Sequence, residues 1–417
     1  MTLNKRTTAM EGYFLAATII LLVASLPSLA YANIFGLFPA GAGCKSAAME
    51  TAGDCSEGQT LLYNPAVMSQ LKPGFSGEIG AARLQYSYEH PMFDPVQVSV
   101  LSPMFSEGWK GLWADNKLSW GFAVMPSSSA ELDIKGLPRR VDGNPESLNI
   151  KATKKQFHFA LGASYLWPNL DLSTGFSLVY TYDHRTLNGS AVTNPSTTLV
   201  DMKGTGNFVR PVAGMSWQQE NHSLGASYMF PLTKRFSGKT KLAIEPKPFN
   251  TEQVDYDPGV LLTNFKTELN PFTLSANVNR IFGAKGRSIH RDGLNRRTHE
   301  ADLKDVNHVG ARIGYNAGDL GRFAVGAAYL DSYWGDGFYY KDVDGIPHQE
   351  IGHLFGQFNA IPVRNQAIVW EQNFGSWNTE TALFRSAGTT TVGGDGDNPG
   401  HYQIEFISLT CSIHRAM

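Results

Sequence analysis

The sequence predicts an all-β protein: a transmembrane antiparallel β-barrel of about fourteen strands with a small N-terminal hatch inside its lumen. Three observations lead to this prediction. Apolar residues alternate with small or polar ones from residue 75 onward, short turns alternate with long polar connections, and a secretory signal precedes both. The expected organisation is a signal peptide at residues 1–32, a hatch at 33–74 and the barrel at 75–417.

The composition fits a barrel better than a set of soluble domains. Charged residues make up 17% of the 417-residue chain, below the roughly 25% typical of soluble domains. The formal net charge of −2 argues against a nucleic-acid partner, which requires a basic face. Residues 41–46 do not fit a phosphate loop and no Gly-x-Ser-x-Gly motif occurs, so we expect no cofactor and no enzymatic activity.

The N-terminus has the three parts of a secretory signal peptide. Lys5 and Arg6 give a positive start, residues 14–26 form a short apolar run, and residues 30–32 are an Ala-x-Ala cleavage site. We therefore expect the mature chain to begin at Asn33. The alternative, an uncleaved membrane anchor, is disfavoured because the apolar run is short for a membrane span.

The alternation after residue 75 has the period of two that defines a strand. Residues 157–166 place Phe157 and Phe159 on one face and His158 and small residues on the other, and the pattern resumes at 170–182. A soluble β-sandwich is the alternative. It is disfavoured because the aromatic faces would need a second sheet to cover them and because the polar connections are long for a compact domain.

The connections between strands fall into two sizes, which is the pattern of outer-membrane barrels. Short turns are expected at residues 115–116, 168–169, 219–221, 270–271, 317–319 and 375–376. Long polar loops are expected at residues 126–155, 183–203, 239–257, 284–307, 331–364 and 386–400. Pro126 is expected to end the strand that starts at Leu118, because proline cannot donate to a ladder.

The stretch at residues 41–71 is expected to form the hatch. It is rich in small residues, lies between the signal and the first strand, and contains Asn64-Pro65-Ala66 near its end. Cys44 and Cys55 also lie here, in an exported and oxidising setting. They are expected to form a disulfide, and the alternative is two small buried residues.

Specific residues of this stretch resemble the N-terminal hatch of the FadL/TodX (OMPP1) family of outer-membrane hydrophobic-compound channels. The matching residues are Gly43, Ala47, Ala48, Tyr63, Asn64, Pro65, Ala66, Met68 and Leu71. Residues 230–232 and 236–238 also resemble a mid-barrel strand of the family. The resemblance implies a barrel of fourteen strands, an N-terminal segment that lines the inner binding site and moves to release ligand, and a kinked strand that gives a lateral exit into the membrane. The last strand of an outer-membrane barrel usually ends in an aromatic residue, and this sequence has none there.

The candidate site residues follow from this resemblance and from the apolar groups in an expected outer loop. The resemblance implies a ligand-binding or hatch role for Ile34, Phe35, Leu37, Phe38, Asn64, Pro65 and Ala66. An exposed loop with many apolar groups indicates a capture surface or a lid, formed by Trp334, Phe338, Tyr339, Leu354, Phe355 and Phe358. An acidic head group would need a lumen-facing cation, for which Arg210, Arg280 and Arg312 are candidates. No metal site is expected, because His348 and His353 lack the spacing of a zinc motif.

The expected function is passive uptake of long-chain fatty acids or other hydrophobic compounds through the bacterial outer membrane, gated by the hatch. The alternatives are a general porin for hydrophilic substrates and an outer-membrane lipid hydrolase. The expected partners are a hydrophobic small molecule, outer-membrane lipid and lipopolysaccharide, and the chain is expected to be a monomer. Lipopolysaccharide phosphates suit arginine-rich segments, and one such run contains Lys285, Arg287, Arg291, Arg296 and Arg297.

Overall fold

The computed structural model describes most of the predicted barrel and the end of the predicted hatch. The described residues are 57–70, 73–89, 96–113, 117–141, 144–191, 197–242, 247–283, 285–292, 295–302, 305–331, 362–375, 377–392 and 400–416. The predicted signal peptide, Ile34, Phe35, Leu37, Phe38, Cys44 and Cys55 lie outside them, as do the six residues of the predicted capture surface.

The described chain consists of strands, apart from four short helical turns. The helical elements are α4 (Glu57–Tyr63), η1 (Pro65–Gln70), η2 (Pro168–Leu170) and η3 (Gly318–Leu320). The strands are β1 (Gly74–Glu89), β2 (Val96–Trp113), β3 (Leu118–Val141), β4 (Asn144–Trp167), β5 (Leu172–Ala191), β6 (Thr197–Gln219), β7 (His222–Met229), β8 (Leu232–Leu242), β9 (Phe249–Asp257), β10 (Val260–Leu269), β11 (Phe272–Ile281), β12 (Lys285–Asp292), β13 (Asn295–Asp302), β14 (Val306–Asn316), β15 (Arg322–Leu330), β16 (Val363–Phe374), β17 (Trp377–Val392) and β18 (Gly400–Ala416). Among the described residues, no helix has the length and apolarity needed to span a bilayer.

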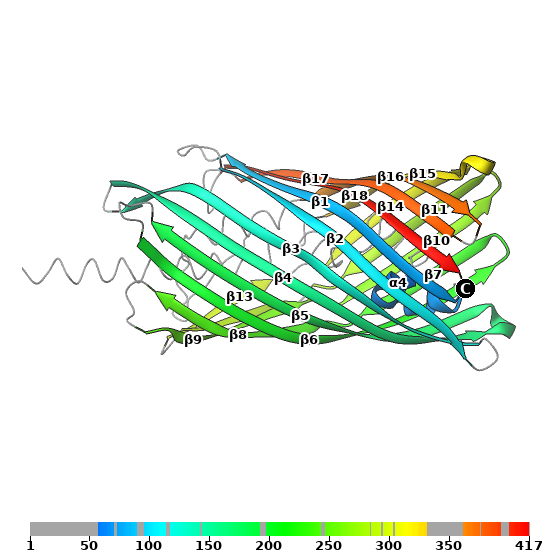
Figure 1. Cartoon of the computed structure of the whole chain (residues 1–417), viewed down its shortest axis with the longest axis horizontal. Coiled ribbons are helices and arrows are strands. Elements are labelled where there is room, and N and C mark those ends of the chain that lie inside the picture. The colour runs from blue at the N-terminus through cyan, green and yellow to red at the C-terminus, as the bar shows by residue number, and fades with distance from the viewer. Residues whose placement is uncertain are drawn as a thin grey trace, which may run out of the picture.

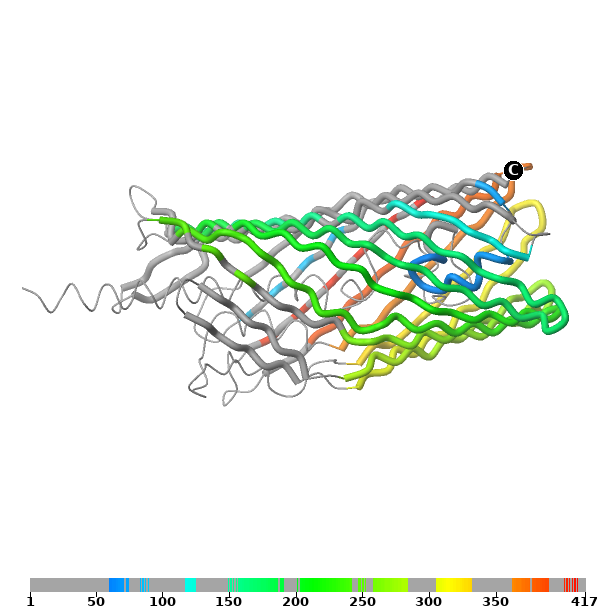
Figure 2. Tube along the Cα trace, turned by 90° about the horizontal axis from the view of Figure 1, so that it is seen from below, coloured from blue at the N-terminus to red at the C-terminus, as the bar shows by residue number. Residues whose placement is uncertain are grey.

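The strands pair in an antiparallel ring, seen from two sides in Figures 1 and 2. Ladders join β1 through β7 in order, pass from β7 to β10, β11 and β14, continue through β15 to β18, and return from β18 to β1. The described ring therefore has fourteen strand positions, as predicted. The remaining segments β8, β9, β12 and β13 continue β7, β10, β11 and β14 beyond short breaks, and pair with one another and with β6. The final strand pairs on both sides although it has no terminal aromatic residue.

Several predicted strand ends are wrong, and in each case the observed strand is longer than the predicted one. Much of the expected loop chain at 126–155, 183–203, 239–257 and 284–307 is strand. Pro126 does not end its strand, because β3 continues to Val141 and pairs Pro126 with Phe157, with a register shift between Ser127 and Ala130. These hairpins extend beyond the apolar part of the barrel, where polar residues on both faces do not interrupt a ladder.

The two faces of the wall differ as expected for a barrel that crosses a membrane. On β5, Phe176 and Leu178 point outward and remain 50% and 44% exposed, whereas Ser177 between them is buried. Strand partners repeat this parity, since Ser177 lies opposite the buried Val212 on β6. Aromatic rings also gather near the short turns, where the indole N–H of Trp167 donates to the hydroxyl of Thr174. The apolar side chains therefore face lipid, and the small or polar ones face the lumen.

A charge placed on the lipid face tests this assignment. We expect Leu178→Lys to lower the free energy of unfolding by about 2–4 kcal/mol, the cost of a lysine near the bilayer midplane. Urea titration of protein refolded in lipid vesicles, followed by tryptophan fluorescence, measures the loss. Leu170→Lys is the matched control, because Leu170 lies in the η2 turn and is 60% exposed. Equal losses in the two variants would contradict a lipid-facing Leu178.

Candidate functional site

The helical segment α4–η1 lies inside the barrel, near the end where the C-terminus is found (Figure 1). It packs against β1 to β6. Every residue from 60 to 68 is buried, with Leu61 and Leu62 each at 1% exposure and Tyr63 at 0%. A segment so enclosed is part of the packed interior of the barrel, and residues 57–70 are called the hatch helix below.

Asn64 joins the two turns of the hatch helix to each other and to the wall. Its backbone amide donates to the carbonyl of Thr60 at 2.9 Å, and its carbonyl accepts from Val67 at 3.1 Å. Its side-chain oxygen accepts from the amide of Ala66 at 3.2 Å, while its Nδ2 donates to the carbonyl of Met215 on β6 at 3.1 Å. Pro65 opens η1, a position where its missing N–H is not needed. Asn64 and Pro65 therefore fix the shape and position of the hatch helix.

Wall side chains meet the polar groups that a short helix leaves unsatisfied at its end. Ser177 on β5 donates to the carbonyl of Leu61, and Ser227 on β7 donates to the carbonyl of Tyr63. Farther along the segment, Ser69 donates to the hydroxyl of Ser173 on β5 at 2.6 Å, and Gln70 donates to the hydroxyl of Ser216 on β6 at 2.9 Å. The hatch helix is thus attached to strands far away in sequence.

Two wall glycines leave the space that the hatch helix fills. A Cβ added at Gly175 would collide with the backbone of Pro65 and Ala66. A Cβ added at Gly214 would collide with the side chain of Asn64. The requirement for glycine at these positions comes from close approach of the hatch and not from backbone conformation.

The predicted site residues are thus only partly placed. Asn64, Pro65 and Ala66 lie together at the wall, and their contacts are with β5 and β6. Their role in binding a ligand stays a prediction, as does that of the residues outside the described chain.

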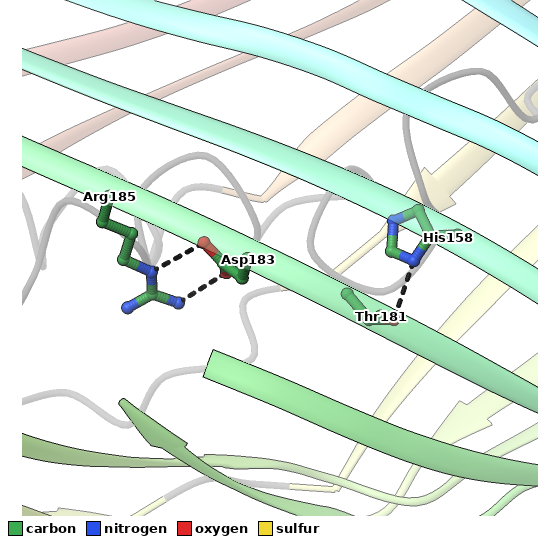
Figure 3. A network of polar contacts seen from close by, with 4 residues as sticks. All are labelled: His158, Thr181, Asp183 and Arg185. Atoms are coloured by element: carbon green, nitrogen blue, oxygen red, sulfur yellow. Dashed lines mark hydrogen bonds and ion pairs between the residues drawn. The ribbon is translucent and has the colours of Figure 1, made fainter. Parts of the chain in front are cut away.

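Sequence reasoning missed a buried ion pair on the inner face of β5. Arg185 Nη2 lies 3.0 Å from Asp183 Oδ2, and the two side chains are 5% and 0% exposed. Arg185 also stacks on Phe236 of β8, with its guanidinium carbon 3.4 Å from the ring centroid. Figure 3 shows the pair beside His158, whose Nδ1 lies 2.8 Å from the hydroxyl of Thr181.

A glycine on the neighbouring strand leaves room for the ring on which Arg185 stacks. Asp183 lies opposite Gly206 on β6, and a Cβ added at Gly206 would lie 2.9 Å from the Phe236 ring. The parity of β5 could have revealed these residues, since Asp183 continues the inward positions that alternate with its aromatic ones. The prediction of a loop at residues 183–203 excluded Asp183 and Arg185 from this alternation.

The three arginines expected to serve a head group face different ways. Arg210 on β6 lies opposite the buried Val179 of β5 and therefore faces the lumen. Arg312 is buried, and its Nη2 lies 2.8 Å from Glu371 Oε1. Arg280 lies on the outward parity of β11 and pairs with Asp305. Two of the three candidates therefore face the lumen. Within the described chain, no group of three or more His, Cys, Asp or Glu side chains is arranged to hold a metal ion.

Comparison with known proteins identifies the fold. No family model matches the sequence, and no curated protein matches it. Three solved structures match closely in shape. A Pseudomonas aeruginosa FadL homologue has a TM-score of 0.65 at 10% identity, covering 91% of this chain and 98% of its own. The Pseudomonas putida toluene transporter TodX has a TM-score of 0.61 at 12% identity, covering 91% and 99%. The Ralstonia pickettii toluene transporter TbuX has a TM-score of 0.56 at 11% identity, covering 92% and 100%. The chain therefore has the fold of the FadL/TodX family, and the resemblance expected from residues 41–71 is confirmed at the level of the fold.

Proposed function

We propose that the protein is an outer-membrane channel for the passive uptake of hydrophobic compounds, long-chain fatty acids among them. The observation that carries the proposal is a buried helix held inside a barrel whose wall is apolar outside. A water-filled pore serves apolar solutes badly, because each methylene costs about 0.8 kcal/mol in water. A plugged lumen instead limits leakage of polar solutes. TodX and TbuX, both toluene transporters, support the same class of cargo.

Gating is assigned to the chain ahead of the hatch helix. Residues 60–68 are buried and bonded to three wall strands, so their movement would break many contacts together. We therefore place ligand contact and release on the first residues of the mature chain, Ile34, Phe35, Leu37 and Phe38. The predicted capture surface around Trp334 and Phe355 would collect cargo at the cell surface.

An interrupted ladder supports a sideways exit toward the membrane. The β2–β3 ladder runs from the Trp113–Leu118 pair to the Glu107–Val124 pair. Beyond it, β2 continues to Val96 paired with β1, while β3 continues to Val141 paired with β4. The ladder therefore stops just before Pro126, and unpaired strand edges face each other above that point.

Uptake by whole cells tests the proposal. Cells without a hydrophobic channel of their own would express this protein, and labelled long-chain fatty acid, toluene and a disaccharide would be offered in parallel. We expect either apolar compound to enter and the disaccharide to stay out. Deletion of residues 33–70 should admit the disaccharide and reduce apolar uptake.

Assembly is checked in each strain by the heat-dependent gel mobility of the folded barrel. Entry of the disaccharide alone into cells with the intact protein would select the porin. Apolar uptake unchanged by the deletion would reject the hatch as part of the route. Hydrolysis of a lipid ester by pure protein would select the hydrolase.

A further inference from the structure

The strands that follow β7 around the ring carry a cluster of neutral polar side chains, which we call the amide cluster: Asn264, Asn277, Asn279, His308 and Asn365. All five face inward and none is more than 4% exposed. Asn264 of β10 lies directly opposite Asn277 of β11, and Asn279 lies directly opposite His308 of β14. The cluster thus crosses the inner face of several neighbouring strands.

His308 holds the cluster together across a strand. Its Nδ1 lies 3.1 Å from Asn279 Nδ2 and 3.4 Å from Asn277 Nδ2. Its Nε2 lies 3.3 Å from Asn365 Nδ2, on the far side of β15, where the intervening Ala328 leaves room. The contacts that define the cluster therefore join neutral groups.

Two members of the amide cluster have hydrogen-bonding groups to spare. Neither Nδ2 nor Oδ1 of Asn264 has a partner, although the residue is 2% exposed, and Oδ1 of Asn365 has none either. If the Asn365 amide is turned over, the leftover atom becomes its nitrogen. A buried polar group without a partner is unfavourable, so these atoms call for a polar occupant. Asn264 offers a donor group, its NH2, and an acceptor group, its carbonyl oxygen, and a hydroxyl can accept from the first and donate to the second.

An apolar band lies beside the amide cluster, on the side away from the short turns. Its members are Val260, Ile281, Val306, Leu330 and Val363, each at most 3% exposed. Ile281 lies opposite both Val260 and Val306, and Leu330 lies opposite Val363. The inner wall is therefore itself amphipathic, with an apolar band above and a neutral polar band below.

We propose that this wall binds an apolar molecule that carries one neutral oxygen group, with the tail on the apolar band and a hydroxyl at Asn264. The inference rests on the proposed function, because the ligand must enter the lumen. An ionised carboxylate fits less well, since it cannot donate to the free oxygen of Asn264. The nearby cation Arg312 is already held by Glu371.

Binding of matched twelve-carbon probes to the intact protein in lipid nanodiscs tests the proposal. The probes, chosen for equal chain length, are radiolabelled 1-dodecanol, dodecane and dodecanoate. We expect dodecanol to bind more tightly than dodecane. Asn264→Leu should weaken dodecanol binding about tenfold, the loss expected for its paired hydrogen bonds, and leave dodecane binding unchanged. Asn378→Leu, at an exposed position beside a short turn, is the matched control and should change neither.

Thermal unfolding of the empty protein separates a binding role from a structural one. Because the Asn264 amide has no partner, the leucine variant should be as stable as the unaltered protein or more stable. A clear loss of stability would show that the amide is structural, or held by fixed water, and would overturn the inference. Equal binding of dodecanol and dodecane would overturn it as well while leaving the proposed function standing. Failure of all three probes to bind would reject the inference together with the proposed function.

Discussion

Gly175→Ala should open the barrel to small polar solutes. The added methyl group would collide with the backbone of Pro65 and Ala66, which cannot move without disturbing the attachment of Asn64 to β6. Overpacking of this kind costs about 1–3 kcal/mol, which raises the undocked population of the hatch helix by roughly 5- to 150-fold. Liposome swelling in a disaccharide solution measures the leak.

Gly204→Ala is the matched control for this experiment. Gly204 also faces the lumen, on β6, but the nearest atom to an added Cβ is the carbonyl oxygen of Ser237 at 3.7 Å. The control should therefore leak no more than the unaltered protein. A correctly folded Gly175→Ala barrel with no added leak would show that the hatch helix does not block the lumen.

Asp183→Ala should be among the most destabilising single changes in the wall. It would leave Arg185, 5% exposed, as a buried charge without its carboxylate. Removing one partner of a buried ion pair costs about 3–5 kcal/mol, whereas replacing both by apolar groups is often neutral. The double variant D183A/R185M should therefore recover most of the loss. The free energy of unfolding in lipid vesicles, obtained by urea titration, gives both values.

A pair whose carboxylate is exposed serves as the control. Lys266 Nζ lies 3.4 Å from Glu268 Oε1, and the Glu268 side chain is 58% exposed. Glu268→Ala should cost no more than about 1 kcal/mol, as for other solvated pairs. If Asp183→Ala costs as little, the lumen around Arg185 is filled with water and the pair is solvated.

The strand alternation was predictable because it is imposed locally. A strand with lipid on one side and lumen on the other must alternate with a period of two, so residues 157–182 show their pairing and their outward faces without any knowledge of the fold. The short turn at 168–169 is equally local. The turn at Asn64-Pro65-Ala66 is local as well, because the bonds of Asn64 to Thr60, Ala66 and Val67 are made within a few residues.

The limits of the strands were not predictable from polarity. Beyond the apolar belt both faces of a hairpin meet water, so polar residues no longer distinguish a strand from a loop. For this reason the polarity of residues 183–191 predicts a loop, although they continue β5.

The sequence by itself therefore determined the barrel and its outward face. Only the tertiary structure decided which inward side chains meet. Asn279, His308 and Asn365 are far apart in sequence and come together through the register of β11, β14, β15 and β16. Arg185 stacks on Phe236 of β8, and Gly206 of β6 leaves room for that ring. Contacts of this kind depend on the closure of the ring, and no local pattern encodes them.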